Sequence, residues 1–351
     1  MLVTAAVLAA SAHAVRTALS DSAAASASRD AVCPVCDHAF EVVVRSPADR
    51  GAGISRDLMP RAVRAQPICF LVHTCPRCFY SGYLDDFQVP GRVDDALRSR
   101  VLRAPGLRPA TPISATMSQH EIPVTTRYAL AAQVYEWRGA SAEARAWLAL
   151  RWAWVVRDEG SFVPPTPLMI RAMREIERRL PEWRADANQA DRELQAAVAL
   201  LADHQAGHYA GPLEAHVRLA IATVLRRQGE LRPADTLLAG LLDDSTLEGN
   251  LPAVVRRMRA SIVEERRLLG EARGLFQRAV SRGDPKPENL AAACYLLGEI
   301  CRRLEDDAAA RDWYDRALRT DRLDSALRRW ATQQRELLVP AGAASDAGAA
   351  P

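Results

Sequence analysis

Lysine is almost absent from this sequence: Lys286 is the only one, although lysine and arginine together account for 46 of the 351 residues. A phosphate-binding loop requires a lysine followed by serine or threonine after a glycine-rich turn, and Lys286 follows Asp284 and Pro285 instead. The chain also lacks a Gly-x-Ser-x-Gly elbow, and His120-Glu121 has no second histidine at helical spacing. These absences predict a protein that is not an enzyme.

Long hydrophobic runs are missing as well. The apolar run Leu2–Ala10, followed by Ala12-His13-Ala14, imitates the core and cleavage site of a signal peptide but is too short to span a bilayer. No lysine or arginine precedes it. We therefore expect residues 1–29 to be a disordered or misassigned start, with a signal peptide at residues 1–14 as the alternative, and we expect no membrane partner.

The charge balance gives no strong electrostatic signal, since the formal net charge is +3. No extended field that would attract nucleic acid or a membrane surface is implied. With 49% hydrophobic and 25% charged residues, the composition is that of an ordinary globular protein, long enough for two or more domains. The seven cysteines are odd in number and include two Cys-x-x-Cys pairs, which favours a reducing compartment, so we predict a cytoplasmic protein.

Four of the cysteines form two similar turns, Cys33-Pro34-Val35-Cys36 and Cys75-Pro76-Arg77-Cys78. Two such turns that face one another supply four thiolates in the tetrahedral arrangement of a closed structural Zn²⁺ site. The 38 residues between them exceed the usual spacing of about 15 to 20, but each doubling of a loop adds only about 0.6 kcal/mol of closure entropy. We predict that Cys33, Cys36, Cys75 and Cys78 bind a structural zinc ion.

Other uses of these residues remain as alternatives. A dithiol redox site would require a βαβ setting, which the sequence does not provide, and a catalytic zinc site would require an open coordination position. His38, His73 and Cys69 could replace one of the ligands, although they fit ordinary strand and turn positions. Cys294 and Cys301 lie seven residues apart on one predicted helix and are expected to pack in the core.

The chain divides into a front module and a helical remainder. We expect a zinc-ribbon-like module at residues 30–90, with strands at 40–44 and 69–73 and a loop at 45–67 that contains two glycines and three prolines. Residues 91–123 form a proline-rich linker with one short helix at 93–102. Residues 124–338 form the helical domain, and the alanine- and glycine-rich residues 339–351 are expected to be disordered.

The helical part contains an internal repeat. Ala234, Ala272 and Ala310 lie 38 residues apart, and each is followed four residues later by a large apolar side chain. This alternation of small and large residues is typical of tetratricopeptide-like helical hairpins, which bury a continuous core by stacking. The predicted fold is therefore mainly α: a tetratricopeptide-like helical-repeat solenoid preceded by a small β zinc-ribbon-like module. Further copies are predicted at residues 130–152 and 221–241, and the copy at residues 251–281 has a poor first helix.

Two arginine pairs occupy the same place in two of the repeats, Arg226-Arg227 and Arg302-Arg303. Guanidinium groups along the groove of a helical array would favour a carboxylate-bearing protein or peptide. In a chain so rich in arginine they could equally be solvated charges near helix C-termini. We predict a non-enzymatic, zinc-stabilised scaffold or adaptor that binds a protein or peptide through this groove.

Binding of nucleic acid by the ribbon is the second hypothesis. Residues 30–90 contain six arginines against seven acidic residues, which is a poor footprint for phosphate contacts. A local patch at Arg56, Arg61 and Arg64 keeps this alternative open. A thiol redox enzyme or another enzyme without a sequence motif is the third hypothesis.

Three motifs taken together resemble the bacterial family of unknown function DUF2225. They are the Cys-Pro-x-Cys pair, Arg151-Trp152-Ala153-Trp154-Val155-Val156-Arg157-Asp158, and Tyr295-Leu296-Leu297-Gly298-Glu299-Ile300-Cys301-Arg302-Arg303-Leu304. The resemblance, over about residues 31–320, implies that the four predicted ligands are the family's cysteines, followed by tetratricopeptide-like helices without an assigned activity. The sequence departs from the family at Asp37 and Phe79, where glycine, which readily adopts positive φ, usually follows each turn.

Overall fold

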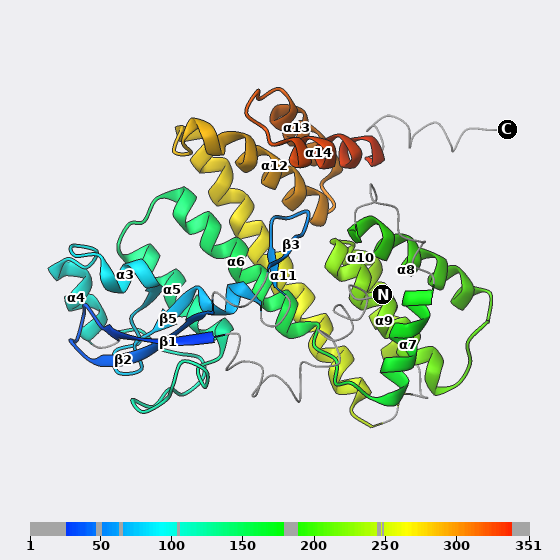
Figure 1. Ribbon diagram of the computed structural model, residues 1–351, viewed down its shortest axis with the longest axis horizontal. Coiled ribbons are helices and arrows are strands. Elements are labelled where there is room, and N and C mark those ends of the chain that lie inside the picture. Colours follow the sequence, from blue (N-terminus) through cyan, green and yellow to red (C-terminus); the bar gives the residue numbers. More distant parts are fainter. Residues whose placement is uncertain are drawn as a thin grey trace.

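A computed structural model describes residues 26–46, 51–62, 66–103, 106–178, 189–243, 247 and 249–338. A small β region lies beside a larger set of helices (Figure 1), and the predicted class, mainly α with a small β module in front, is confirmed. Residues 1–25 and the tail at 339–351, both expected to be disordered, lie outside the described residues.

The β module contains two antiparallel strand pairs around the cysteine turns. Strand β1 (Ser26–Val32) pairs with β2 (Ala39–Arg45), which confirms the strand predicted at 40–44. The prediction of disorder was wrong for residues 26–29, because they pair with β2. Strand β5 (Val72–Thr74) pairs with β6 (Ser81–Tyr83).

A short 3₁₀ helix, η1 (Pro67–Phe70), replaces the first part of the strand predicted at 69–73. Pro67 begins this helix with a φ that its ring has already set. Helix α3 (Leu84–Gln88) follows β6 directly. The second cysteine turn therefore lies between β5 and β6, in the same way that the first lies between β1 and β2.

The segment predicted as a loop at 45–67 contains a third strand pair. Strands β3 (Gly51–Ile54) and β4 (Pro60–Ala62) form a hairpin, which we call the arm (residues 51–62). In Figure 1 the arm extends from the β module toward α11 and α12. Its tip is inserted into the helical part, where Arg56, Asp57 and Met59 are all buried. The loop prediction was wrong for residues 51–62, where two neighbouring strands pair and the tip is held by residues far away in the sequence.

The predicted linker connects the module to the helices. It contains the expected short helix, α4 (Asp95–Leu102), whose first turn is capped by the Asp94 carboxylate at 2.7 Å from the Leu97 amide. Its Gln119 side chain is buried and hydrogen-bonds both backbone groups of Thr74, at 3.0 and 2.6 Å. The linker is thus attached to the edge of β5.

Helical hairpins form at three of the predicted repeats. They are α5 (Val124–Trp137) with α6 (Ala142–Gly160), α9 (Pro212–Gln228) with α10 (Leu231–Leu242), and α12 (Pro287–Arg303) with α13 (Asp307–Leu318). Helices α7 (Pro167–Arg178) and α8 (Gln189–Gln205) precede α9, and α14 (Ser325–Leu337) follows α13. The three alanines of the 38-residue repeat, Ala234, Ala272 and Ala310, are all buried. A tetratricopeptide array stays a prediction.

The remaining repeat copy is a single helix, α11 (Leu251–Arg282), which runs along α6 through the middle of the molecule (Figure 1). The first helix of this copy was predicted to be poor, and no turn divides it from the second. Leu268 and Leu269, where the turn would fall, are both buried, and Gly270 and Gly274 remain helical. Burial on both sides of this point keeps the backbone helical, so α6 and α11 form one long core contact.

The glycines that follow α5 and α9 provide a matched test of how closely α12 packs against the end of α9. Gly139 and Gly229 both have positive φ, +65° and +92°, but a Cβ at Gly139 would meet no atom within 4 Å. A Cβ at Gly229 would lie 2.7 Å from Nη2 of Arg302 and 2.8 Å from Cγ of Arg303. We expect Gly139→Ala to lower the free energy of unfolding by about 1 to 2 kcal/mol from backbone strain alone. Gly229→Ala should lower it by about 3 kcal/mol or more, because overpacking adds to the strain.

Urea denaturation of the two variants and the parent chain measures this difference. Equal losses for the two substitutions would contradict the close approach of the two arginines to the end of α9.

Candidate metal centre and the buried arginines

The two cysteine turns have the same backbone hydrogen bonds. In the first, the Cys33 amide donates to the His38 carbonyl at 2.9 Å and the Asp37 amide donates to the Cys33 carbonyl at 3.0 Å. In the second, the Cys75 amide donates to Tyr80 and the Phe79 amide donates to Cys75, both at 2.9 Å. Each turn is held at its base by a strand pair, so the four sulfurs are fixed by local hydrogen bonds.

The four thiol sulfurs converge on one point. All of them lie within 4.8 Å of one another, with Sγ of Cys33 3.5 Å from Cys78 and Sγ of Cys36 3.6 Å from Cys75. These distances are too long for disulfides, whose sulfurs lie about 2.05 Å apart. A tetrahedron with metal–sulfur bonds of about 2.3 Å has edges of about 3.8 Å. The geometry therefore fits a divalent ion bound by four thiolates.

Electrostatics within the cluster also fit a cation. The Cys33 thiol donates a hydrogen bond to Cys75 and so lowers the pKa of Cys75 to about 2, while the same bond raises the pKa of Cys33 to about 12. Hydrogen bonds from Cys78 to Cys33 and Cys75 raise the pKa of Cys78. Without a cation these hydrogen bonds favour the thiolate form of Cys75 and the protonated forms of Cys33 and Cys78. Four thiolates at these distances require a positive charge between them.

The residues after each turn adopt the conformation that glycine would favour. Asp37 has φ +57° and Phe79 has φ +65°. These are the two positions where the family resemblance implies glycine. The turn geometry is therefore intact although Asp37 and Phe79 replace glycine. Each of the two residues has a backbone φ that costs an L-residue about 1 to 2 kcal/mol.

Aromatic contacts hold the module together, and polar contacts fix it to the helix α5. The Phe87 ring packs edge-on against Tyr80 and Phe40, with centroids 5.3 and 5.5 Å apart. The buried carboxylate of Asp86 accepts hydrogen bonds from the Tyr135 hydroxyl at 2.7 Å and from Nη1 of Arg138 at 2.6 Å. The metal centre is thus continuous with the helical part, which the strand pattern alone did not indicate.

The alternative ligands are separate from this cluster. His73 is fully buried in β5 and neither ring nitrogen has a hydrogen-bond partner, and desolvation lowers its pKa to about 4. Burial raises the pKa of Cys69 to about 12. Cys294 and Cys301 are buried in α12, as expected for core residues. All seven cysteines are free thiols.

The arginines expected to line a partner groove are mostly internal. Arg226 is fully buried, with Nε 3.0 Å from Oε2 of Glu265 on α11 and Nη1 2.8 Å from the Ser261 hydroxyl. Nη1 of Arg302 lies 2.8 Å from Oε1 of Glu230, and its Nη2 lies 3.1 Å from Oε2 of Glu299.

Arg303 is buried too, with Nη2 3.4 Å from Oδ2 of Asp57, while Arg227 keeps partial exposure. The periodicity placed these residues correctly along their helices. The assignment of Arg226, Arg302 and Arg303 to an open groove was wrong, because carboxylates of the same chain neutralise all three.

Asp57, at the tip of the arm, is the residue that sequence analysis missed. Its Oδ2 lies 2.5 Å from Nη2 of Arg157 on α6 as well as 3.4 Å from Arg303 on α12, and only 1% of Asp57 is exposed. The two cations hold its pKa well below the usual range despite burial. Beside it, the Tyr295 hydroxyl donates to the Arg56 carbonyl at 2.7 Å.

A signal for this network was present in the sequence. Arg157 and Arg303 both stand within the apolar motifs on which the family resemblance depends, and charges in such segments indicate buried pairs. The sequence did not identify their partner, because Asp57 is 100 residues from Arg157 along the chain.

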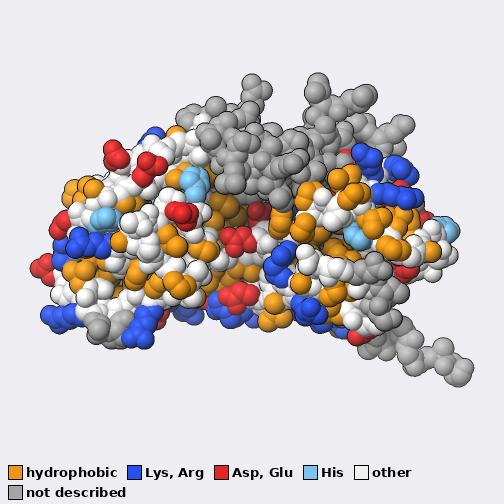
Figure 2. All heavy atoms as spheres, turned by 90° about the horizontal axis from the view of Figure 1, so that it is seen from below, with side chains coloured by type: hydrophobic (Ala, Val, Ile, Leu, Met, Phe, Trp, Pro, Cys, Tyr) orange, Lys and Arg blue, Asp and Glu red, His pale blue; other side chains and the backbone are white. Residues whose placement is uncertain are grey.

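Of the basic patch considered for nucleic acid, only Arg56 and Arg61 lie in the described part of the chain, and neither is fully exposed. Arg56 is buried, and Nε of Arg61 donates to the Ser55 hydroxyl at 2.9 Å. Arg64 lies outside the described residues. Figure 2 shows basic side chains at several separate places on one face, with acidic side chains between them. Neither observation favours contact with a phosphate backbone.

Comparison with known proteins agrees with the motifs. The model of the family described as "Uncharacterized protein conserved in bacteria (DUF2225)" matches residues 27–201, which include all four cysteines, the arm and α6. The chain belongs to the DUF2225 family. The match is shorter than the expected 31–320, and the motif at 295–304 lies outside it. No curated protein and no solved structure matches this DUF2225 chain.

Among the helices of the described segments, none combines the length and the apolar character that crossing a membrane would require.

Because of the strain after each turn, we expect substitution by glycine to stabilise the chain at Asp37 and to destabilise it at a helical control position. Asp37 is exposed and has positive φ, so Asp37→Gly should raise the free energy of unfolding by about 0.5 kcal/mol by removing that strain. Asp95→Gly is the matched control, because Asp95 is exposed in the first turn of α4. It should lower the free energy by about 1 kcal/mol. Urea midpoints of the metal-loaded chains measure both, and a loss of stability in Asp37→Gly would contradict this account of the turn.

Proposed function

We propose that this protein is a non-enzymatic scaffold of a reducing cytoplasm, in which a structural zinc ion fixes the front module and the helices bind a protein or peptide. The observation that carries the proposal is the closed set of four sulfurs. Such a set fills the tetrahedral shell of zinc and leaves no position for water or substrate. None of the seven cysteines is paired in a disulfide, which supports the reducing compartment.

Thiol redox chemistry is the less favoured reading of the same residues. In a redox pair the two cysteines of one turn exchange a disulfide, and one turn is sufficient. Here sulfur distances of 3.5 Å between Cys33 and Cys78 and of 3.6 Å between Cys36 and Cys75 join the two turns to each other. This pairing supports a metal site built from both turns.

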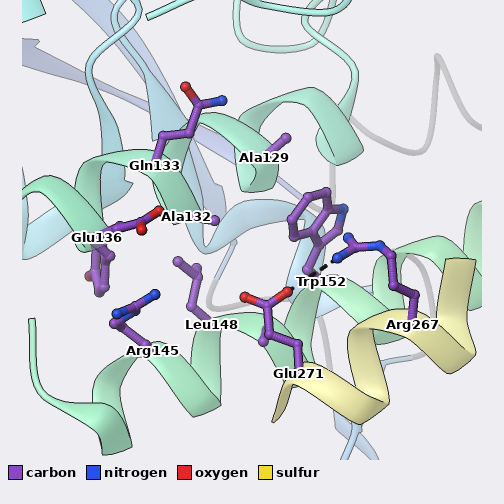
Figure 3. A pocket seen from close by; sticks show the side chains of 11 residues that line it. Ala129, Ala132, Gln133, Glu136, Arg145, Leu148, Trp152, Arg267 and Glu271 are labelled. Atoms are coloured by element: carbon purple, nitrogen blue, oxygen red, sulfur yellow. Dashed lines mark hydrogen bonds and ion pairs between the residues drawn. The ribbon is translucent and has the colours of Figure 1, made fainter. Parts of the chain in front are cut away.

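A shallow groove between α5, α6 and α11 is the place we propose for the partner. It has a volume of about 210 Å³, and Figure 3 shows the side chains around it. Ala132, Leu148 and Ala149 contribute apolar surface, and the Trp152 ring stands at one end with the Arg267 guanidinium 5.5 Å from its centroid. An apolar centre with a polar edge is the usual anatomy of a protein interface.

The edge of this groove is polar at both ends. Arg267 lies 3.3 Å from Oε2 of Glu271 on one side, and Gln133, Glu136 and Arg145 lie on the other. Charges of both signs would orient a partner segment and select its register more than they would add affinity. This groove replaces the arginine-lined groove predicted from the repeats.

The zinc proposal predicts one zinc ion per chain. The double substitution Cys33→Ala/Cys75→Ala should abolish binding, because it removes one ligand from each turn. Cys69→Ala is the matched control: Cys69 lies in the same module but outside the cluster, so its removal should leave the metal content unchanged.

Elemental analysis of the purified chains measures the stoichiometry and separates zinc from iron, which tetrahedral sulfur sites also bind. A wild-type chain without metal, or a double variant that retains it, would contradict the proposal.

The partner proposal predicts that filling the groove prevents binding. Ala132→Arg places a long charged side chain against Leu148 and Trp152. The amount of any protein that the wild-type chain captures should therefore fall at least about tenfold. The control is Ala202→Arg on the exposed face of α8. Quantitative affinity capture from a bacterial lysate, with zinc content checked in each variant, compares them. Equal capture by both variants would exclude this groove, and no capture by the wild type would count against the adaptor role.

A further inference from the structure

The arm and the metal centre belong to one closed segment of chain. The first turn ends at Cys36 and the second begins at Cys75, so a metal bound by both turns closes the segment between them. The arm lies within this segment, and its tip reaches the helical part. Closing a segment restricts the positions that its middle can visit, and so favours any contact that the middle makes in the native state.

The contact at the tip is a buried ion pair, which is sensitive to the loss of one partner. Asp57 faces Arg157 and Arg303, and both guanidinium groups are almost fully buried. The remaining carboxylates are farther away, with Nε of Arg157 3.4 Å from Glu265 and Nε of Arg303 3.8 Å from Glu299. A buried cation that loses its closest counter-charge is strongly destabilised.

The helices around the tip pack closely around this charge cluster. A Cβ at Gly160 would lie 2.0 Å from the Ser261 hydroxyl and 3.1 Å from Nη1 of Arg226. The lack of a side chain at the end of α6 leaves room for Arg226 beside Glu265. If the arm left, the buried arginines would lose Asp57. The tightly packed helices around them would then have to rearrange.

We propose that the metal centre controls the docking of the arm, so that loss of the metal releases Asp57 from Arg157 and Arg303 and loosens the ends of α6 and α12. This inference rests on the proposed zinc site and adds a regulatory consequence to it. The ion would act on the tip of the arm through the chain that it closes. A change in metal occupancy at the front module would then change the packing at the end of α6. The same helix also lines the proposed partner groove.

Hydrogen–deuterium exchange of the full chain, with zinc bound and after removal by a chelator, tests the inference. We expect amide exchange at residues 55–59 and 299–304 to rise at least about tenfold after zinc removal, with little change at residues 195–205 of α8. Asp57→Asn should produce the same increase while one zinc ion stays bound, because it removes the counter-charge directly. Asp85→Asn, an exposed carboxylate of the same module, is the matched control and should change neither exchange nor zinc content.

The outcomes separate the two proposals. A chain that binds no zinc overturns both. A chain that binds zinc, and whose residues 55–59 exchange equally before and after zinc removal, overturns the metal-controlled docking and leaves the structural zinc site in place. Because the chelator experiment uses the unmodified chain, the inference is decided even where Asp57→Asn fails to fold.

Discussion

The contact of Asp57 with Arg157 and Arg303 joins three parts of the chain that are far apart in sequence: the arm, the end of α6 and the end of α12. A buried charge is tolerated only with a close partner, and here one carboxylate serves two cations. Met59 of the arm packs in the hydrophobic core with residues of α6 and α12, and the Tyr295 hydroxyl donates to the Arg56 carbonyl. These contacts and the ion pair together fix the position of the arm, and with it the relation of the β module to the helices.

The candidate metal site and the ion pair would hold the same segment at two places. Sulfur ligands at Cys36 and Cys75 would close the segment at its base, and Asp57 fixes its middle. Asp86 provides a third attachment through Tyr135 and Arg138 on α5. The module is therefore bound to the helices by polar contacts on two sides. A zinc ribbon on a flexible linker would have no such contacts, and this difference favours a structural role for the cysteines over an independent binding module.

The parts that could be predicted from sequence are those determined by neighbours in the chain. The cysteine turns, the strand at 40–44 and the short helix after Asp94 follow from local spacing, proline and capping. The arm could not be predicted, since its partner Arg157 is 100 residues away. The repeat gave the helical positions of Arg226 and Arg303 correctly, but not the face that would be buried. That face depends on α11 being one helix, which brings Glu265 beside Arg226.

The burial of these arginines also explains why the repeat is irregular. In a regular array of hairpins, each first helix presents one face to an open groove. Here α11 runs alongside α6, and the arm approaches α12, so that Glu265 and Asp57 meet those arginines from inside the chain. The close approach of Arg302 and Arg303 to Gly229 then requires a residue without a side chain at the end of α9. The family match at 27–201 contains Asp57 and Arg157 but ends before Arg303. The ion pair between Asp57 of the arm and Arg157 of α6 therefore lies wholly within the region that matches the family model. Arg303 of α12 adds a second cation to this pair from outside that region.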